Sequence, residues 1–305
     1  MKNSNYPPIY YDELVEEISE LLKKDKEIIK KKVWLEALNP GYNVLNPGYN
    51  VKEDAVKYGI TPYVYNSKME NFYRDTAGFI FETLVESCRP SKQEVLKRIK
   101  QRINEYLKIN NGRKINILMS GDGVGSDTIY LYNFYKKYAN FFYFDVPGSK
   151  TFDFAMKRFK KHHIDTKLIT VYEEIPKNYF DVVISLEVLE HLPNPEESIK
   201  DISKWLKNGG IALVTESFAN LSLNLPTHLK SNLKYAGKTP LLFLRYNLFL
   251  TYYSNDPILL FRPMEFTKKE KTNLVDKYNL FSQKLILKEF IKGYIKRCLI
   301  KIKRI

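Results

Sequence analysis

The stretch INILMSGDGVGSD, residues 115–127, decides the fold of this chain. A short apolar run is followed by Gly121, Gly123 and Gly125, and the residues after them resume the apolar spacing of a helix. Glycine permits positive φ and close approach of a ligand to the backbone, and the N-terminus of the next helix then faces that ligand. This order of strand, glycine turn and helix is typical of α/β folds that bind nucleotides or phosphates, but it does not by itself identify the ligand.

A carboxylate lies at the end of the next predicted strand. FFYFDV, residues 141–146, has the composition of a buried strand, and Asp145 follows Gly121 by 24 positions. A carboxylate at this place can accept hydrogen bonds from both ribose hydroxyls of an adenosyl or nicotinamide–adenine ligand. The glycine turn and Asp145 together predict an adenosine-binding crevice and leave the choice of cofactor open.

Short apolar runs continue to alternate with helical patterns after this unit. Further strands are predicted at residues 167–172, 180–186 and 210–217, with helices between most of them. Such alternation indicates an α/β fold, with a Rossmann-like, doubly wound and mostly parallel sheet. We expect this core to occupy residues 113–217.

Two extensions flank the predicted core. Residues 1–112 form a helical N-terminal extension, with one helix at 10–37 and a helical pattern at 69–107 that Pro90 divides into two helices. Residues 218–305 form a mixed C-terminal extension that ends in a basic amphipathic helix.

Two features of the N-terminal extension have alternative interpretations. The heptapeptide LNPGYNV occurs twice in tandem, at 38–44 and 45–51, and we interpret it as a duplicated surface loop because Asn-Pro-Gly favours turns. Phe72 and Tyr73 belong to an aromatic helical pattern, for which core packing is the favoured interpretation. The alternative is a lid over the ligand site.

The stretch FDVVISLEVLEHLPNPEESIKDISKWLKNGGIALVTES, residues 180–217, narrows the choice of ligand. It contains, in order, an FD pair at the start of a strand, the motif LEVLEHL at 186–192, and the turn LKNGG at 206–210 before the last strand of the core. With these motifs the chain resembles the class I S-adenosylmethionine-dependent methyltransferase family. The resemblance covers about residues 113–217 and implies a methyltransferase with S-adenosylmethionine as cofactor.

The resemblance also implies roles for single residues. Four of them match cofactor-binding positions of the family: Gly121, Gly123 and Gly125 in the loop, and Asp145 at the ribose hydroxyls. An acid after the third strand would contact the adenine amino group, for which we favour Glu173 over Glu174, and Glu187 would contact cofactor or acceptor. One position departs from the family pattern, because Met119 stands where an Asp or Glu is usual. Asp122 is the candidate to replace that polar contact.

His191, which directly follows the fourth strand, is the candidate catalytic residue. As a general base it would accept the proton of a hydroxyl acceptor. The alternative is that it packs against or caps the next turn, because the motif around it occurs in enzymes with different acceptors. His228, Tyr235 and Lys238 lie after the fifth strand, in the segment that would shape the acceptor pocket.

The charge of the chain points to anionic partners. The net charge is +14, with 49 basic against 35 acidic residues, and eight basic residues lie between positions 284 and 304. An amphipathic basic helix there fits a solvated face of a helix packed on its own domain, or peripheral contact with an anionic membrane surface. Nucleic acid is disfavoured as a partner, because no RNA-binding module or aromatic–basic platform accompanies the charge.

The N-terminus and the two cysteines indicate the cellular compartment of the protein. The N-terminus has no apolar h-region, and the two cysteines, Cys88 and Cys298, are far apart and show no metal-ligand spacing. We therefore expect a reduced, cytoplasmic protein, peripheral at the inner membrane surface if the basic helix binds lipid. No metal site is predicted, and the sequence leaves the oligomeric state open.

From these observations we expect an enzyme that methylates an oxygen of a small molecule or of a glycan sugar. An RNA or protein methyltransferase is the alternative, and a non-catalytic cofactor-binding scaffold is a third interpretation. A nicotinamide dehydrogenase is disfavoured because the motif at 186–192 does not belong to that class.

Overall fold

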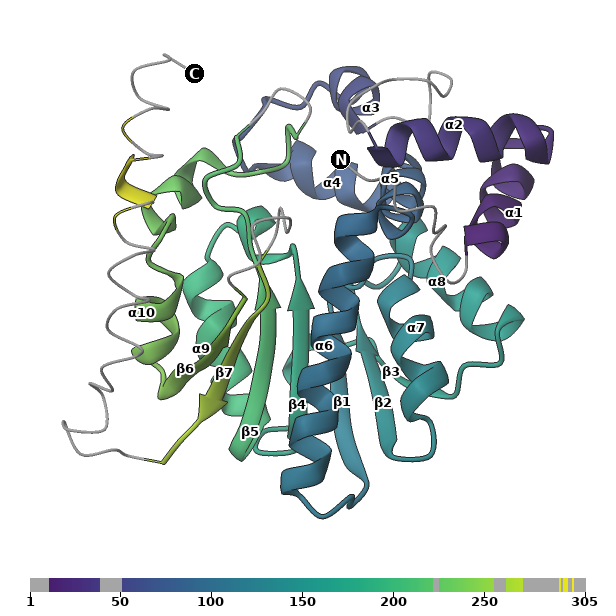
Figure 1. The fold of residues 1–305 in the computed structure, drawn as a ribbon. Helices are drawn as coiled ribbons and strands as arrows, with labels where there is room; N and C mark the ends of the chain where they lie inside the picture. Colours follow the sequence, from purple (N-terminus) through teal and green to yellow (C-terminus); the bar gives the residue numbers. More distant parts are fainter. Residues whose placement is uncertain are drawn as a thin grey trace.

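Seven strands form one sheet in the computed structural model of the chain, which describes residues 11–38, 51–221, 225–254 and 262–270, together with 291, 293–295 and 298 (Figure 1). The strands are β1 (Ile115–Ser120), β2 (Ala139–Phe144), β3 (Thr166–Ile169), β4 (Phe180–Leu186), β5 (Leu206–Thr215), β6 (Leu248–Tyr253) and β7 (Met264–Lys268). The helices are α1 (Tyr11–Leu22), α2 (Lys26–Leu38), α3 (Val51–Lys57), α4 (Ser67–Asp75), α5 (Gly78–Ser87), α6 (Pro90–Ile109), α7 (Ser126–Tyr135), α8 (Lys150–Lys161), α9 (Pro195–Trp205) and α10 (Thr239–Leu244). The 3₁₀ turns are η1 (Tyr172–Glu174), η2 (Leu189–His191) and η3 (Lys230–Tyr235).

The strands lie in the order β3-β2-β1-β4-β5-β7-β6. All pairs among β1 to β5 are parallel, whereas β7 pairs antiparallel with both β5 and β6. The strand order reverses between β1 and β4, and in doubly wound sheets the ligand binds at such a reversal, outside the carboxyl ends of the strands. The predicted Rossmann-like, mostly parallel sheet is confirmed, and the C-terminal extension adds its two antiparallel strands.

Each face of the sheet packs against its own set of helices, because successive side chains of a strand point to opposite faces. Ile117 and Met119 of β1 share a core with α6, α7 and α8. Leu118, between them, packs instead with residues of α9 and α10. β4 is buried along its whole length, as expected of a parallel strand covered on both faces. Figure 1 shows α6 crossing one face of this central region.

The N-terminal helices gather at the carboxyl ends of the parallel strands (Figure 1). Buried residues of α1, α2 and α5 form one cluster with Val124 of the glycine loop. Arg158 of α8 connects α1 to the glycine loop. Its guanidinium lies 2.8 Å from the Glu17 carboxylate of α1 and donates to the Val124 carbonyl at 2.7 Å. The N-terminal extension is thus anchored on the loop that is predicted to bind the cofactor.

The first predicted helix, at 10–37, consists of two helices. Lys23 has a φ of 52°, which ends α1 in the left-handed region. The Asp25 side chain then accepts hydrogen bonds from the backbone amides of Glu27 and Ile28, so that α2 begins with its own cap. The periodicity on both sides was correct, but the turn between them was missed.

The helical pattern at 69–107 holds three helices rather than two. Pro90 is the first residue of α6, where proline is favoured. The additional break lies at Thr76, whose hydroxyl donates to Asp54 at 2.5 Å and accepts from the amide of Gly78 at 3.0 Å. A side chain from another helix therefore fixes the boundary between α4 and α5.

The predicted turn LKNGG at 206–210 is a bulge at the start of β5, because Phe180 pairs with Leu206 while Val182 pairs with Ile211.

Both cysteines, Cys88 and Cys298, are free. Most of the duplicated heptapeptide and of the basic C-terminal helix lies outside the described residues. Among the helices that are described, none is both long and apolar enough to cross a bilayer.

Candidate active site

The loops after β1 and β4 meet at the point where the strand order reverses. Gly121 opens the first loop, and its amide donates to the carbonyl of Phe144 at 2.9 Å. A Cβ at Gly121 would lie 2.5 Å from Cγ2 of Val188 in the second loop. The two loops are therefore in direct contact, and glycine is required for this approach.

The glycine loop adopts a conformation that other residues rarely adopt. Gly121, Gly123 and Gly125 have φ values of 79°, 55° and 74°, in the left-handed region where a Cβ is unfavourable. Gly125 is followed directly by α7, and a Cβ there would lie 2.4 Å from the ring of Phe159 in α8. The loop thus brings backbone N–H groups and the N-terminus of α7 to the carboxyl edge of the sheet.

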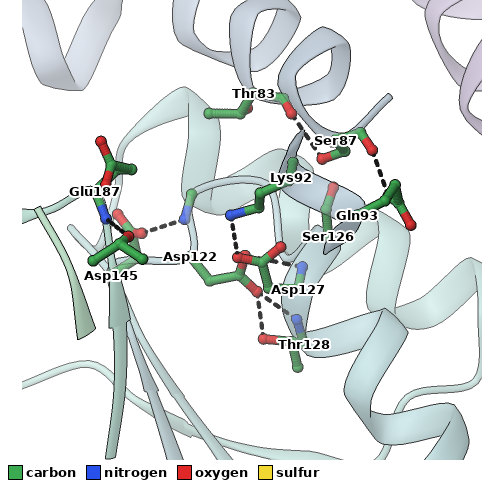
Figure 2. Close-up of polar contacts among 12 residues, drawn as sticks. Thr83, Ser87, Lys92, Gln93, Asp122, Ser126, Asp127, Thr128, Asp145 and Glu187 are labelled. Atoms are coloured by element: carbon green, nitrogen blue, oxygen red, sulfur yellow. Dashed lines mark hydrogen bonds and ion pairs between the residues drawn. The ribbon is translucent and has the colours of Figure 1, made fainter. Parts of the chain in front are cut away.

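Asp145 lies one residue after β2, beside this loop (Figure 2). Its carboxylate accepts hydrogen bonds from the amides of Gly123 and Val146, each at 2.7 Å. Burial raises the pKa of Asp145, and the two backbone hydrogen bonds oppose that shift. The sequence-predicted ribose acid and the glycine loop are therefore held together by a direct contact.

Asp122, inside the loop, faces the helix behind it. Its carboxylate accepts from the amide of Asp127 at 3.1 Å and from the amide and hydroxyl of Thr128 at 2.7 and 2.5 Å (Figure 2). Lys92 of α6 completes the group with an ion pair to Asp127 at 2.7 Å. Burial, and then the charge of Asp127, raise the pKa of Asp122 to about 7. Both carboxylate oxygens of Asp122 therefore accept hydrogen bonds from the first turn of α7. Met119 is buried in the sheet.

Glu187 directly follows β4 and has a φ of 55°. This is a strained conformation for a residue with a Cβ, of the kind found at functional sites. Its amide is held by Thr215 at the end of β5, donating to the hydroxyl at 3.0 Å. Burial, and then the neighbouring Glu190, raise the pKa of the Glu187 carboxyl well above its usual range. Its Oε1 atom is buried and accepts no hydrogen bond from a donor group of the described residues, but the Glu187 and Glu190 carboxyl groups hydrogen-bond to each other.

Glu190, His191 and His228 come together next to Glu187. The imidazole rings of His191 and His228 cross at 86° with centroids 4.7 Å apart. Burial, and then the charge of His191, lower the pKa of His228 to about 4, so that this ring is neutral near pH 7. Burial raises the pKa of Glu190, but the charge of His191 and the hydrogen bonds of Glu187 and Ser217 lower it by more, so that the net shift is downward. Ser217 donates to Glu190 Oε1 at 2.5 Å.

Hydrogen bonds from α4 and from the chain after β5 hold the turn that carries His191. Nδ1 of His191 lies 3.0 Å from the hydroxyl of Tyr73 in α4 and 3.3 Å from the carbonyl of Thr227. The side-chain amide of Asn232 donates to the carbonyls of Glu190 at 3.1 Å and Leu192 at 2.8 Å. The ring orientation of His191 is therefore set by an N-terminal helix and by the chain after β5.

The structure brings most of the sequence-predicted site residues to one edge of the sheet. The glycine loop touches both Asp145 and the β4 loop, and Glu187 and His191 follow one another in that loop. Glu173 lies exposed in η1, after β3, and shares no hydrogen bond with the others within the described chain. Its contact with adenine stays a prediction, as does the catalytic role of His191.

Sequence reasoning missed the contacts around His191. Tyr73 was interpreted as core packing or a lid, and His228 was placed in an acceptor segment without a partner. Asn232 carried no signal at all. These residues are separated from His191 by long stretches of chain, 118 positions in the case of Tyr73, and no local spacing connects them.

Comparison with known proteins identifies the family. A family model described as "Methyltransferase domain" matches residues 91–257, more than half of the 305 residues. A solved structure from Nostoc punctiforme PCC 73102, provisionally described as an O-methyltransferase, has a TM-score of 0.52 and 12% identity, covering 83% of this chain and 88% of that one. A SAM-dependent methyltransferase from Aquifex aeolicus has a TM-score of 0.46 and 13% identity, covering 58% of this chain and 92% of that one.

The Nostoc structure confirms the fold, and the family model carries the identification. No curated protein matches the sequence. The glycine loop and the strand-end carboxylate beside it agree with the family that the motifs at 180–217 indicated. The chain belongs to the class I S-adenosylmethionine-dependent methyltransferases and is an enzyme whose cofactor is S-adenosylmethionine.

Proposed function

We propose that this methyltransferase acts on a hydroxyl oxygen of a small molecule or of a glycan sugar, with His191 as the residue that takes the hydroxyl proton. The observation that carries the proposal is the hydrogen bonding of the His191 ring. Nδ1 lies 3.3 Å from the Thr227 carbonyl and 3.0 Å from the Tyr73 hydroxyl, so this side of the ring is occupied by protein contacts. We propose the tautomer in which Nδ1 donates to the carbonyl, which leaves the lone pair of Nε2 for a hydroxyl acceptor. A hydroxyl acceptor needs such a base, whereas a thiolate or a neutral amine does not.

The residues around the glycine loop fit the cofactor. Asp145 presents a carboxylate beside the backbone of Gly123, which suits ribose hydroxyls next to a glycine loop. Oε1 of Glu187 accepts no hydrogen bond from a donor group of the described chain and would accept one from a polar group of cofactor or acceptor, and Glu173 would contact the adenine amino group. When bound, S-adenosylmethionine supplies an electrophilic methyl group on its sulfonium. The protein supplies alignment of the reactants, an effect worth about 7–11 kcal/mol in well-oriented systems.

Label transfer from methyl-labelled S-adenosylmethionine tests the acceptor class. The purified enzyme would be incubated with sugar nucleotides, lipid-linked glycans, RNA and a protein extract in parallel. We expect label on a hydroxyl oxygen in one of the first two pools. His191→Asn should lower kcat by about 10²- to 10⁴-fold, the usual contribution of a general base, while the Kd for S-adenosylhomocysteine stays unchanged.

The matched control is His163→Asn, at an exposed position in α8's C-terminal turn. Its activity should equal that of the unchanged enzyme. Labelled product that RNase or protease destroys would overturn the proposal in favour of the RNA or protein alternative. Full activity of His191→Asn would remove the base from the mechanism and leave His191 as a packing residue.

We also propose that the enzyme meets its acceptor at an anionic membrane surface. The basic segment at 284–304 predicts an amphipathic helix. Three apolar side chains described within it, those of Ile291, Tyr294 and Ile295, are 49%, 58% and 51% exposed. Gly293 of the same segment is buried against the backbone of Ala236, so one side of the segment packs on the protein's own domain. The exposed apolar side chains lie away from that contact, beside the lysines, where they could contact lipid.

A further inference from the structure

A buried group of nitrogen and oxygen donors lies directly after β4. Glu190 is 1% exposed and His228 is 6% exposed. Glu190, His191 and His228 each offer one donor atom, and these three atoms lie within 4.8 Å of one another. Oε2 of Glu190, Nδ1 of His228 and Oε1 of the adjacent Glu187 are all buried, and no donor group of the described chain hydrogen-bonds to them. The two carboxyl groups hydrogen-bond to each other, which requires a proton between them. A cation in place of that proton would also satisfy Nδ1 of His228, because buried polar atoms almost always have a partner.

The other polar atoms of the same side chains are already held. Nδ1 of His191 faces the Thr227 carbonyl and the Tyr73 hydroxyl, and Oε1 of Glu190 accepts from Ser217. Histidines that bind a metal through one ring nitrogen usually donate the other to a carbonyl, and their carboxylate neighbours accept hydrogen bonds. The turn itself is fixed by the Asn232 amide. The arrangement therefore has the outer contacts of a metal site as well as its donors.

We propose that Glu190, His191 and His228 bind a divalent transition-metal ion, with Glu187 as a further oxygen donor. Two imidazoles with carboxylates suit Zn²⁺, Co²⁺, Mn²⁺ or Fe²⁺, whereas Mg²⁺ and Ca²⁺ prefer oxygen donors alone. Donor atoms of a tetrahedral site with bonds near 2.1 Å lie about 3.4 Å apart. The three atoms lie within 4.8 Å of one another in the unliganded chain, so binding would draw them closer together.

The role of the ion rests on the proposed function. A divalent ion with an open position lowers the pKa of a hydroxyl that binds it. The O–H bond would then break with its proton passing to water, and the oxygen would keep the electron pair that forms the new bond to the methyl carbon. The bond from that carbon to sulfur breaks, and the sulfur keeps its pair as a neutral thioether. What this role keeps from the proposed function is methylation of a hydroxyl oxygen. With the ion bound, His191 is its ligand, and loss of the proton to water replaces direct proton transfer to His191.

Calorimetric titration of the untagged full-length protein with Co²⁺, and separately with Mg²⁺, tests the site in the absence of any acceptor. We expect one equivalent of Co²⁺ to bind, with a visible absorption band from the nitrogen donors, and Mg²⁺ to bind far more weakly. Glu190→Gln keeps the volume of the side chain and its bond to Ser217, and should weaken Co²⁺ binding by at least about 100-fold, beyond the 10- to 100-fold typical of an outer contact. His228→Asn should do the same.

The control is again His163→Asn, which removes one of the four histidines of the chain outside the cluster; its φ of 53° is one that asparagine tolerates. Melting temperatures of all variants show which are folded. Absence of stoichiometric Co²⁺ binding by the unchanged protein, or equal binding by Glu190→Gln, would overturn the proposal. A proton shared by the two carboxyl groups would then satisfy the unpartnered oxygens. Because binding is measured without acceptor, this outcome leaves the proposed oxygen methylation standing, and an acceptor other than a hydroxyl would leave the metal site standing.

Discussion

Asp145 is the residue on which cofactor affinity is expected to depend most. Its half-buried carboxylate accepts a hydrogen bond from the Gly123 amide, and hydrogen bonds to a charged group contribute about 1.5–3 kcal/mol each. Asp145→Ala should therefore weaken binding of S-adenosylmethionine and S-adenosylhomocysteine by about 10- to 100-fold, measured by calorimetric titration. Asp165→Asn, an exposed acid after α8, should bind as the unchanged enzyme does. Equal affinities for Asp145→Ala and the control would remove Asp145 from the site.

The glycine loop allows a second prediction at single positions, because two glycines with the same backbone angle differ in their surroundings. Gly125 and Gly148 have φ values of 74° and 73°. A Cβ at Gly125 would lie 2.4 Å from the Phe159 ring, whereas a Cβ at Gly148 would have nothing within 4 Å. Gly148→Ala should cost only the left-handed strain, about 1–2 kcal/mol. Gly125→Ala should cost about 1–3 kcal/mol more from overpacking.

Denaturant unfolding of both variants measures that difference. Gly125→Ala should also lose cofactor affinity, since the loop and the N-terminus of α7 move together, and Gly148→Ala should not. Equal stability of the two variants would show that the contact between α7 and α8 relaxes freely around the added methyl group.

At the scale of elements, the contact between α1 and α8 depends on one buried carboxylate. Glu17 lies 2.8 Å from Arg158 and 2.7 Å from His162. Burial raises the pKa of Glu17, but the His162 hydrogen bond and the charge of Arg158 lower it further, so the folded-state pKa lies below its ordinary value of 4.5. A lowered folded-state pKa stabilises the fold above the unfolded pKa, and this contribution is lost as the pH falls through the folded value.

Glu17→Gln should therefore lower the free energy of unfolding by about 3 kcal/mol near neutral pH, as expected when one partner of a buried ion pair is removed. The deficit should shrink as the pH falls below 4.5, because the unchanged protein then loses the same interaction. Urea unfolding at several pH values measures both effects. Glu16→Gln, whose partner Lys26 is about half exposed, is the control and should change stability little. A deficit that does not vary with pH would contradict the assignment.

α4 affects the site through one hydroxyl. Tyr73 stacks on Phe79 with ring centroids 5.0 Å apart, and its hydroxyl reaches His191. Tyr73→Phe keeps the stacking and removes the hydrogen bond, so it should lower kcat by about tenfold while the free energy of unfolding changes by about 1 kcal/mol. Tyr58→Phe, which loses only a hydroxyl bond to the Asp75 carbonyl, is the matched control. A fall in KM with unchanged kcat would indicate that Tyr73 acts on access to the site and not on His191.

Some elements could be predicted from local sequence signals, and others could not. β1, β2 and β4 were predicted within a few residues because each is an apolar run next to a turn, which is a local signal. The break between α4 and α5 is not local: it depends on a hydrogen bond from Thr76 to Asp54 of another helix. The pairing of β6 with β7 likewise depends on a sheet edge that the sequence does not display.

At the scale of the whole molecule the same limit applies to the site. The glycine loop and Asp145 were predictable because each follows a strand of one βαβ unit, and parallel strands end at the same edge. The surroundings of His191 were not, because Tyr73 and His228 come from the two extensions. The residues that we propose bind the cofactor thus lie in local motifs. The surroundings of His191, which we propose face the acceptor, come from segments that are distant in the sequence.

The net charge of +14 leads to a prediction for the molecule as a whole. If the basic segment at 284–304 binds lipid, the enzyme should sediment with vesicles that contain phosphatidylglycerol and not with phosphatidylcholine alone. Binding should weaken as salt shortens the Debye length. The tail variant replaces four lysines of that segment by glutamine: Lys284, Lys288, Lys292 and Lys296. At about 1 kcal/mol for each lysine near the surface, it should lower the partition coefficient by at least about 100-fold.

A control variant with the same change in net charge distinguishes the effect of the segment at 284–304 from the effect of the total charge of the protein. It replaces four exposed lysines elsewhere by glutamine: Lys97, Lys108, Lys136 and Lys137. Long-range attraction depends on total charge, whereas an inserted amphipathic helix depends on which lysines flank its apolar face. Loss of sedimentation in the tail variant alone would place the acceptor at the membrane, where lipid-linked glycans are the first to assay. Equal loss in both variants would mean that the charge acts only as a diffuse field, and soluble sugar nucleotides would then be assayed first.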